Sequence, residues 1–551
     1  MKKRVLATLF AICMIISCLA GCAGNGGEAS NTPAPAASTD TNTAKASDDT
    51  SQTTADTGSK YKTTYGDKMF DNVTITVELF DRSNAPEGST ITDNRWTRYV
   101  NEQMNKVGIT VEFVPVPRWD EVEKMQTMVA GQTAPDITLT YTYAYAEDYF
   151  NQGGIWDLSE FIDGEDQAKN IKAYIGDETL NIGRNEDNAL YGIVARRATT
   201  AKSNLFVRKD WLDALGLSVP TTPDELYTVL DKIVHENPDG RTDVYAIIWN
   251  RWNLRKAFSK IAGDYKENNI ASTEESIQDY YDAGMYDYYK YMNKLYNAGI
   301  LHPEYYTLSE DNFKSLFVTG SVGFMEYSVN ANVDVLRGSL LKTLQENIPT
   351  ADVVSIEPLK NVNDGKQYSA AYASGGLIAF CPKTASEEKV EACMTYLDWM
   401  CSKDGGFVLY HGFEGEHFEF DGDIPIVKDA EYNAKDKDWI RTDIFLTGNQ
   451  GYFATVDDFN ACTSKEAPGY EKYVVENYEN ALVGTVDHDS VYTSPSTSDH
   501  IADLTSVYDE YKTAVITCTP DAFDATWEEY MDELKKVGVE QIIEERKAYF
   551  E

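Results

Sequence analysis

Strand and helix patterns alternate between residues 73 and 140, and this alternation constrains the fold more than any other feature of the chain. Apolar and polar residues alternate along Val73–Phe80 and again along Ile109–Val116, which is the pattern of a strand with one buried face. The segment after each of these strands has apolar residues at helical spacing, and Pro135–Thr140 begins a third strand. Strands that are connected through helices by short turns run parallel, so we predict an α/β sheet.

The ends of these strands indicate where a ligand would bind, because ligands of such sheets bind beyond the carboxyl ends of the strands. Asp81–Asn84 follows the first predicted strand, and Tyr141–Tyr143 follows the third. Strand patterns at Asn204–Asp210 and Tyr245–Trp249 indicate a second α/β region, and 551 residues are enough for two domains. We therefore expect two α/β domains with polar and aromatic residues at their strand ends.

The first 21 residues have the three parts of a signal peptide. Basic residues at Lys2–Arg4 precede an apolar run, Val5–Leu19, of about 15 residues, fewer than the roughly 20 that a membrane span needs. Leu19–Cys22 resembles the lipobox of bacterial lipoproteins, in which cleavage precedes the cysteine and its sulfur carries a lipid. We predict a lipoprotein signal peptide at 1–21 and lipidation of Cys22 (palmitate). The alternative is an ordinary secretory signal with an unrelated cysteine.

The segment after Cys22 has the composition of a flexible tether. Residues 23–60 contain no large apolar side chain, so no burial offsets the entropy of ordering them. We assign residues 22–66 to the lipidated cysteine and a disordered tether that holds a folded body away from a membrane surface.

Charge and cysteine usage exclude several classes of protein. The formal net charge of −40 repels phosphate backbones, so we expect no nucleic-acid partner. Five widely spaced cysteines follow Cys22, and neither a disulfide framework nor a zinc site fits their odd number and spacing. We predict no metal and no cofactor. The five cysteines are Cys381, Cys393, Cys401, Cys462 and Cys518.

A series of short motifs then points to a known family. The motifs are, in order, A-G-Q-T-A-P-D-I (Ala130–Ile137), Y-F-N-Q-G-G-I-W-D-L (Tyr149–Leu158), L-Y-G-I (Leu190–Ile193), L-F-V-R-K-D-W-L-D-A-L-G-L (Leu205–Leu217), P-T-T-P-D-E-L (Pro220–Leu226), L-Y-N-A-G-I-L-H-P-E (Leu295–Glu304), L-D-W-M-C-S-K-D-G (Leu397–Gly405) and H-G-F-E-G-E-H-F (His411–Phe418). Together with the lipobox, this order resembles the extracellular solute-binding proteins of family 1, lipoproteins that feed carbohydrate ABC importers. The resemblance covers nearly all of residues 70–550 and is greatest to the large oligosaccharide- and alginate-binding branch of Gram-positive bacteria.

The resemblance implies a periplasmic-binding-protein-like type II fold, with two α/β lobes around a central ligand cleft and hinge crossings between them. It places lobe 1 at 67–198 plus 372–435 and lobe 2 at 199–371 plus 436–551. It implies a monomeric, membrane-anchored binding component of an ABC importer on the extracellular face of the cell membrane. Its ligand would be a carbohydrate, expected to be an oligosaccharide, and its protein partners would be the permease subunits.

Candidate ligand-binding residues follow from the chemistry of sugars. Sugars present flat apolar faces and a ring of hydroxyl groups, so a site needs aromatic side chains and planar hydrogen-bonding groups. The sequence Trp-Asn-Arg-Trp at 249–252 supplies both directly after a strand, although we expect at least one of these tryptophans to be core. The predicted ligand-binding residues are Trp249, Asn250, Arg251, Trp252, Arg95, Trp96, Tyr141, Tyr143, Arg196, Tyr327, Tyr372 and Ser374.

Two segments invite a metal-binding interpretation, which we do not adopt. Glu414–His417 places a single histidine beside carboxylates, whereas zinc needs three or four converging ligands, so we predict a structural turn. Some members of the resembled family carry a calcium loop at the equivalent of Asn237–Asp243. Here the loop is shorter and Arg241 places a positive charge where calcium needs oxygen ligands.

Two other functions compete with the receptor. A secreted glycoside-active enzyme needs two carboxylates that flank one cleft, and the sequence singles out no pair, so we predict that the protein is not an enzyme. A receptor for a peptide or a cationic solute would suit the acidic composition. Four arginines would oppose a cation if they face the cleft, and they would equally favour an acidic sugar or form surface ion pairs. They are Arg196, Arg197, Arg251 and Arg255.

Overall fold

The computed structural model describes residues 60–185, 187–248, 252–272, 274–334, 338–373, 375–449, 451–453, 455–485, 492 and 494–550. The chain divides into two compact units, residues 1–57 and 58–551, and every described residue belongs to the second. The predicted signal peptide, Cys22 and most of the predicted tether therefore lie outside the described residues. None of the helices in the described ranges has the length and apolar character that a membrane crossing requires.

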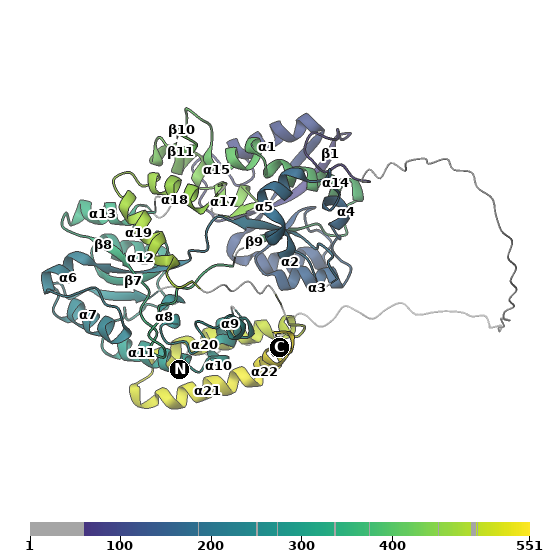
Figure 1. Cartoon of the computed structure of the whole chain (residues 1–551). Coiled ribbons are helices and arrows are strands. Elements are labelled where there is room, and N and C mark those ends of the chain that lie inside the picture. Colours follow the sequence, from purple (N-terminus) through teal and green to yellow (C-terminus); the bar gives the residue numbers. More distant parts are fainter. Residues whose placement is uncertain are drawn as a thin grey trace, which may run out of the picture. The chain divides into compact units, whose positions relative to one another are not determined.

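The main strands of the unit from residue 58 onward form two groups (Figure 1). The first joins a two-stranded and a four-stranded sheet through one bridge, and we call it the first sheet; the second is a four-stranded sheet. In the first, β1 (Val73–Asp81) and β2 (Ile109–Pro117) pair in parallel, as the alternating pattern predicts. A bridge from Val77 to Ile137 connects β1 with the segment that leads into β3 (Thr138–Thr140). The sheet continues through strands that pair in the order β3-β9-β4-β12: β9 (Gly375–Phe380), β4 (Ile193–Arg197) and β12 (Gly448–Asn449).

The second sheet has the strand order β6-β7-β5-β8. Its strands are β6 (Tyr245–Ile248), β7 (Val322–Ser328), β5 (Ser203–Arg208) and β8 (Val353–Ile356). β6 runs parallel to β7, and β5 runs antiparallel to both β7 and β8. β5 is buried along its whole length, and its apolar centre, Leu205–Val207, is flanked by the buried polar residues Ser203, Asn204 and Arg208.

Helices connect the strands of both sheets. Between β1 and β4 lie α1 (Arg95–Met104), η1 (Asn105–Val107), η2 (Arg118–Asp120), α2 (Glu121–Ala130), α3 (Tyr143–Asn151), α4 (Ser159–Ile162) and α5 (Lys169–Ile182). Between β5 and β8 lie α6 (Lys209–Leu215), α7 (Pro223–His235), α8 (Trp252–Lys256), α9 (Tyr265–Ala271), α10 (Glu275–Tyr281), α11 (Met285–Asn297), α12 (Glu310–Val318) and α13 (Leu340–Asn347).

The remaining elements follow β9. Before β12 the chain forms α14 (Glu387–Met400), η4 (Lys403–Phe407), α15 (Val408–His411), the hairpin β10 (Phe418–Asp421) and β11 (Ile424–Val427), α16 (Ala430–Asn433), η5 (Ala434–Asp438) and α17 (Arg441–Ile444). After β12 it forms α18 (Val456–Lys465), α19 (Glu471–Leu482), α20 (Thr497–Thr517), η6 (Pro520–Ala522), α21 (Phe523–Lys536) and α22 (Val539–Phe550). α20 packs on α11 and α21, so the C-terminal helices join the group around the second sheet.

Two segments that connect the sheets lie side by side. Residues 198–202 lead from β4 to β5, and residues 357–374 lead from β8 to β9. Ala201 forms a bridge with Ala371, and the Tyr372 N–H donates to the Thr200 carbonyl at 2.8 Å. The two connections therefore form a short paired strap between the sheets.

Two predicted boundaries differ from the structure. The predicted tether runs to residue 66, but Tyr61 and Thr63 are already buried, with the Tyr61 ring stacked on Phe161 at 4.0 Å. We also predicted that residues 436–551 belong to the second lobe. β12 pairs with β4, and the Arg82 guanidinium bonds Asp443 through both of its carboxylate oxygens, so the chain belongs to the first lobe as far as β12.

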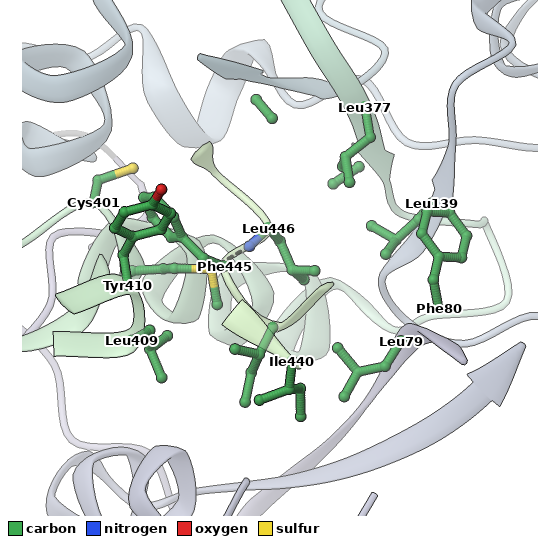
Figure 2. Packing of buried hydrophobic residues seen from close by; sticks show 14 of the residues in the cluster. Leu79, Phe80, Leu139, Leu377, Cys401, Leu409, Tyr410, Ile440, Phe445 and Leu446 are labelled. Carbon is green, nitrogen blue, oxygen red and sulfur yellow. Dashed lines mark hydrogen bonds between the residues drawn. The ribbon is translucent and has the colours of Figure 1, made fainter. Parts of the chain in front are cut away.

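Figure 2 shows the packing that places the chain up to β12 in the first lobe. Ile440, Phe445 and Leu446, which follow η5, lie beside Leu79 of β1 and Leu377 of β9 in one buried cluster. All five side chains are at most 2% exposed. The two-residue strand β12 is therefore held by the core around it more than by its own short ladder.

Candidate functional site

The carboxyl ends of the first sheet's parallel strands meet at one edge. β1, β2 and β3 end there, and the antiparallel strand β9 begins there at Gly375. β4 ends at the same edge, since Arg196 pairs with Gly375 and with Gly448 of β12. Residues that follow β1, β2, β3 and β4 are therefore brought together, as the strand-end argument predicts.

Aromatic and cationic side chains gather at this edge. Trp119, directly after β2, is 78% exposed, and the guanidinium carbons of Arg118 and Arg82 lie 5.3 and 5.8 Å from its ring centroid. The same Arg118 carbon lies 4.5 Å from the Tyr141 ring. An exposed tryptophan held by arginines offers a flat apolar surface with hydrogen-bond donors around it.

Arg197 continues the edge toward the strap. Its guanidinium donates to the Gly375 carbonyl at 3.3 Å and to Asn449 Oδ1 at 3.4 Å, and it stacks on Tyr372 at 4.2 Å. Asn449 in turn donates to the Tyr141 hydroxyl at 3.2 Å. Burial lowers the pKa of Arg197, because the guanidinium has little water around it.

A pocket lies where the strap meets the second sheet's helices. Its lining includes Lys202 and Ala371 from the strap, Trp252 and Lys256 from α8, and Glu275 from α10. It encloses about 670 Å³ of space not filled by atoms, part of it open to solvent. The Lys202 ammonium lies 3.8 Å from the Trp252 ring centroid and 5.5 Å from that of Tyr372.

The two lysines of this pocket are held in a poorly solvated place. Burial lowers the pKa of Lys202 to about 8, and the nearby Arg197 lowers it further while Glu275 and Glu326 act in the opposite direction. Burial likewise lowers the pKa of Lys256 to about 8. Its ammonium donates to Asn268 Oδ1 at 2.9 Å. A desolvated ammonium group gains more than an exposed one from an anionic partner.

Several of the predicted ligand-binding residues lie along this edge and pocket. Tyr141 follows β3, and Tyr143 opens α3 and donates from its hydroxyl to the Gly376 carbonyl at 2.7 Å. Tyr372 lies in the strap between Arg197 and Lys202, and Trp252 lines the pocket. The predicted residues Trp249, Asn250, Arg251 and Ser374 lie outside the described residues.

Two other predicted residues, Arg95 and Trp96, make structural contacts instead. Trp96 is 1% exposed, stacks on Phe413, and donates from its indole N–H to the Asp436 carbonyl at 2.8 Å, so its ring is not available to a ligand. Arg95 pairs with Glu416 at 2.6 Å.

Arg196 and Tyr327 also make structural contacts. The Arg196 guanidinium donates to the carbonyls of Tyr174 and Phe453, each at 3.2 Å. Tyr327 is 7% exposed within β7, with its ring 5.1 Å from that of Phe313. For these two, as for Arg95 and Trp96, proximity to a predicted strand end or crossing brought contacts with other parts of the protein.

The prediction omitted residues that the structure brings to the site. Arg118, Trp119, Lys202, Lys256 and Asn449 were not among the predicted ligand-binding residues. Arg118 and Trp119 directly follow a strand that the sequence does predict, so the strand-end rule, applied to the second strand as well, would have found them. Lys202, Lys256 and Asn449 carry no such local signal, because tertiary packing alone brings them together.

The predicted turn at Glu414–His417 forms a closed polar cluster. His417 Nδ1 accepts the Phe413 N–H at 3.1 Å, and its Nε2 lies 2.9 Å from Asp436 Oδ2. Glu416 binds both terminal nitrogens of Arg95, and hydrogen bonds from Arg95 and then Tyr432 lower the pKa of Glu416 to about 2. Glu416, His417 and Asp436 could together approach one metal ion, but their ligand atoms already have protein partners.

The loop at 237–243 is closed by protein contacts in the same way. Arg241 donates to Asp243 at 2.6 Å and to Ser321 Oγ at 2.9 Å. Asp239 accepts the Trp211 indole N–H at 2.9 Å. The guanidinium thus neutralises a carboxylate of this loop without an ion.

This arrangement, two sheets joined by a paired strap with an aromatic and cationic edge, is that of a two-lobe binding protein. Residues 99–443 match the family model of the bacterial extracellular solute-binding proteins, and the chain belongs to this family. The family resemblance inferred from the motif order is confirmed.

Individual relatives are more distant. The chain is 23% identical over 473 residues to the polygalacturonan/rhamnogalacturonan-binding protein YtcQ of Bacillus subtilis, covering 82% of this chain and 88% of that protein. It is 21% identical over 323 residues to the lipoprotein LipO of the same organism, covering 56% and 61%.

Solved structures show the same fold. The alginate-binding protein AlgQ2 superposes with a TM-score of 0.64 at 18% identity, over 89% of this chain and 100% of that one. FusA, an ABC-transporter substrate-binding protein of S. pneumoniae solved with kestose, gives a TM-score of 0.62 at 15% identity, over 87% and 98%. The predicted two-lobe α/β architecture is confirmed.

Proposed function

We propose that this solute-binding protein captures an oligosaccharide and delivers it to the permease of an ABC importer. The observation that carries the proposal is the edge of the first sheet, where the exposed Trp119 and the partly buried Tyr141 lie among Arg118, Arg197 and Asn449. Aromatic faces stack on the apolar faces of sugar rings, and guanidinium and amide groups bond their hydroxyls. YtcQ and AlgQ2 are named as glycan-binding proteins and FusA was solved in complex with kestose, which supports the same class of ligand.

We further propose that Cys22 carries a lipid and that the following segment tethers a monomeric body to the extracellular face of the membrane of a Gram-positive bacterium. The lipobox and the composition of residues 23–60 support this, as does the similarity to a lipoprotein. The strap would act as the hinge about which two lobes close on a ligand. The protein would bind its ligand unchanged, without acting as an enzyme.

A ligand screen tests the main proposal. The full chain, purified in mild detergent, is melted with neutral oligosaccharides, uronic-acid oligosaccharides and peptides, because a ligand that binds the folded state raises Tm by mass action. At least one oligosaccharide is expected to raise Tm and to be recovered intact. Stabilisation by peptides alone would contradict the ligand class, and release of shorter sugars would indicate a glycoside-active enzyme.

Lipidation has a separate test. Cells that express the chain are fed labelled palmitate, and the label is expected in the wild-type protein and absent from Cys22→Ala. Equal labelling of both proteins would contradict an anchor at Cys22.

A further inference from the structure

We propose that the ligand is an acidic oligosaccharide and that its carboxylates bind three cationic side chains in and beside the strap: Arg197 at the end of β4, Lys202 in the strap and Lys256 in α8. We call these residues the cationic row. The inference rests on the proposed function and adds to it the charge of the sugar and the side chains that bind that charge.

The geometry of the cationic row is set by two aromatic rings. Tyr372 lies between Arg197, at 4.2 Å from its ring centroid, and Lys202, at 5.5 Å. Trp252 lies 3.8 Å from the Lys202 ammonium and stands in the same helix and the same pocket as Lys256. The row thus runs from the end of β4 across the strap into the pocket.

Two other arginines near the site are neutralised by carboxylates. Arg82 binds Asp443 at 2.8 Å, and Arg255 in α8 binds Asp279 at 2.6 Å. By contrast, among the residues that the structure describes, no carboxylate oxygen lies within 4.0 Å of a side-chain nitrogen of Arg197 or Lys202.

The lack of a carboxylate in ion-pair contact with Arg197 and Lys202, within the described ranges, contrasts with the acidic composition of the chain. The chain has 89 acidic residues against 49 lysines and arginines, so carboxylate partners are plentiful for most cations. Glu275 and Asp282 also line the pocket, but Asp282 Oδ1 is used by the N–H groups of Lys260 and Gly284 at 3.0 and 2.9 Å. Leaving two cations without an ion pair costs desolvation energy, which an anionic ligand would offset.

Electrostatic coupling within the row supports the same conclusion. After burial, which lowers both pKa values most, Glu275 raises the pKa of Lys202 and Asp282 raises that of Lys256. Within the row, Arg197 lowers the pKa of Lys202 and Lys202 lowers that of Lys256, by less than these carboxylates raise them. Like charges held close together repel, so a carboxylate placed among them would interact favourably with all three. Guanidinium and ammonium groups that bind carboxylate make the stronger class of hydrogen bond.

The aromatic rings beside the row favour a uronic acid over a small inorganic anion. A uronic acid residue is a pyranose ring with apolar faces that carries a carboxylate. Tyr372 and Trp252 offer flat surfaces next to the cations, which match both parts of such a residue.

The experiment compares each acidic sugar with its methyl ester, which lacks the negative charge and carries one extra methyl group on each carboxyl. Trisaccharides of galacturonate, glucuronate and alginate, and the methyl esters of the same trisaccharides, are titrated into the full chain by calorimetry. At least one acid is expected to bind at least about tenfold more tightly than its ester, since a charged hydrogen bond contributes more than a neutral one. Lys202→Met should weaken binding of that acid by about 10- to 100-fold and binding of its ester by less than about threefold.

Two further variants control the result. Lys106→Met removes an equal charge from an exposed lysine whose ammonium bonds Gln103, and its affinity should match wild type. Lys202→Arg keeps the positive charge and should retain most of the affinity that Lys202→Met loses. Thermal melts show whether each variant is folded. If Lys202→Met does not fold, Arg197→Met gives the same comparison.

The outcomes separate the two proposals. Equal binding of acid and ester, equal loss in Lys202→Met and Lys106→Met, or binding of neutral sugars alone overturns the charge inference and leaves the oligosaccharide receptor standing. Binding of acidic peptides with no binding of any sugar overturns both.

Discussion

Two regions of the molecule combine a cation with an aromatic ring, and they differ in what surrounds the cation. At the start of α1, Arg95 is held by Glu416 at 2.6 Å and Asp436 at 3.3 Å, next to the buried ring of Trp96. At the end of β4, next to the strap, Arg197 faces carbonyl and amide oxygens and a tyrosine ring. The first cation already has its anions, whereas the second is placed to receive one. The set of partners, more than the residue types, distinguishes a structural cluster from a binding site.

The largest expected effect is a loss of folding stability when the structural cluster around Arg95 and Trp96 is disrupted. Trp96→Ala removes a side chain that is 1% exposed and whose indole N–H is bonded, so the free energy of unfolding should fall by about 3–5 kcal/mol. Chemical denaturation measures the loss. Affinity for sugar in the folded protein should not change, and a large loss of affinity at unchanged stability would place Trp96 in the site.

The second prediction concerns the proposed binding site, where the affinity for an acidic sugar should depend on pH. Lys202 and Lys256 have pKa values of about 8, so both are mainly protonated below pH 8 and lose their charge as the pH rises through that value. A carboxylate raises these pKa values on binding. Affinity for an acidic trisaccharide should therefore be constant below pH 7 and fall above pH 8, by up to about tenfold per pH unit for each lysine involved.

Charged neighbours define the control for this pH series. Lys202 faces Arg197, Glu275 and Glu326, and Lys256 faces Asp282 as well as Arg255. Titration of the methyl ester over the same pH range detects any change in the pocket itself. A parallel fall for the acid and the ester would contradict a role for lysine charge.

The third prediction concerns Trp119→Ala, which makes the same substitution as Trp96→Ala but at an exposed position. Trp119 is 78% exposed, so its removal should change the free energy of unfolding by no more than about 0.5 kcal/mol. Loss of a stacking surface should weaken sugar binding by about 2- to 10-fold, as measured by calorimetry. A loss of stability with unchanged affinity would reverse the roles assigned to the two tryptophans.

The smallest expected effect on stability concerns the ion pair between Arg95 and Glu416. Arg95 donates to Glu416 and is the main cause of the low Glu416 pKa of about 2. This pair stabilises the fold above the ordinary carboxyl pKa of about 4.5, and the contribution is lost as the pH falls toward 2. Both side chains are more than a third exposed, so Arg95→Met should cost at most about 1 kcal/mol at pH 7.

Denaturation at two pH values checks this prediction. The difference in stability between wild type and Arg95→Met should be larger at pH 7 than at pH 2.5, and sugar affinity at pH 7 should match wild type. A loss of affinity in Arg95→Met would mean that its cluster takes part in ligand binding.

Local sequence patterns predicted much of the fold. The alternation along 73–80 and 109–116 identified β1 and β2, because each strand has one face in the core. β12 has two residues and therefore no period, so its place in the first sheet depends on packing of distant segments such as Ile440 and Phe445.

The candidate site was less predictable. The strand-end rule brought Tyr141 and Tyr143 to the edge, but Trp96 and Trp119, each preceded by an arginine, look alike in sequence and differ in exposure from 1% to 78%. Lys202 and Lys256 are 54 positions apart and become neighbours only through the strap and α8. Such contacts depend on the fold as a whole.

Hydrogen exchange of the full chain, with and without the acidic trisaccharide that binds most tightly in calorimetry, tests which of the two regions is the site. Binding at the strap predicts slower exchange in residues 197–202, 252–256 and 370–373, with no change in residues 95–99 and 413–418. Protection of residues 95–99 and 413–418 without protection of the strap would contradict the account.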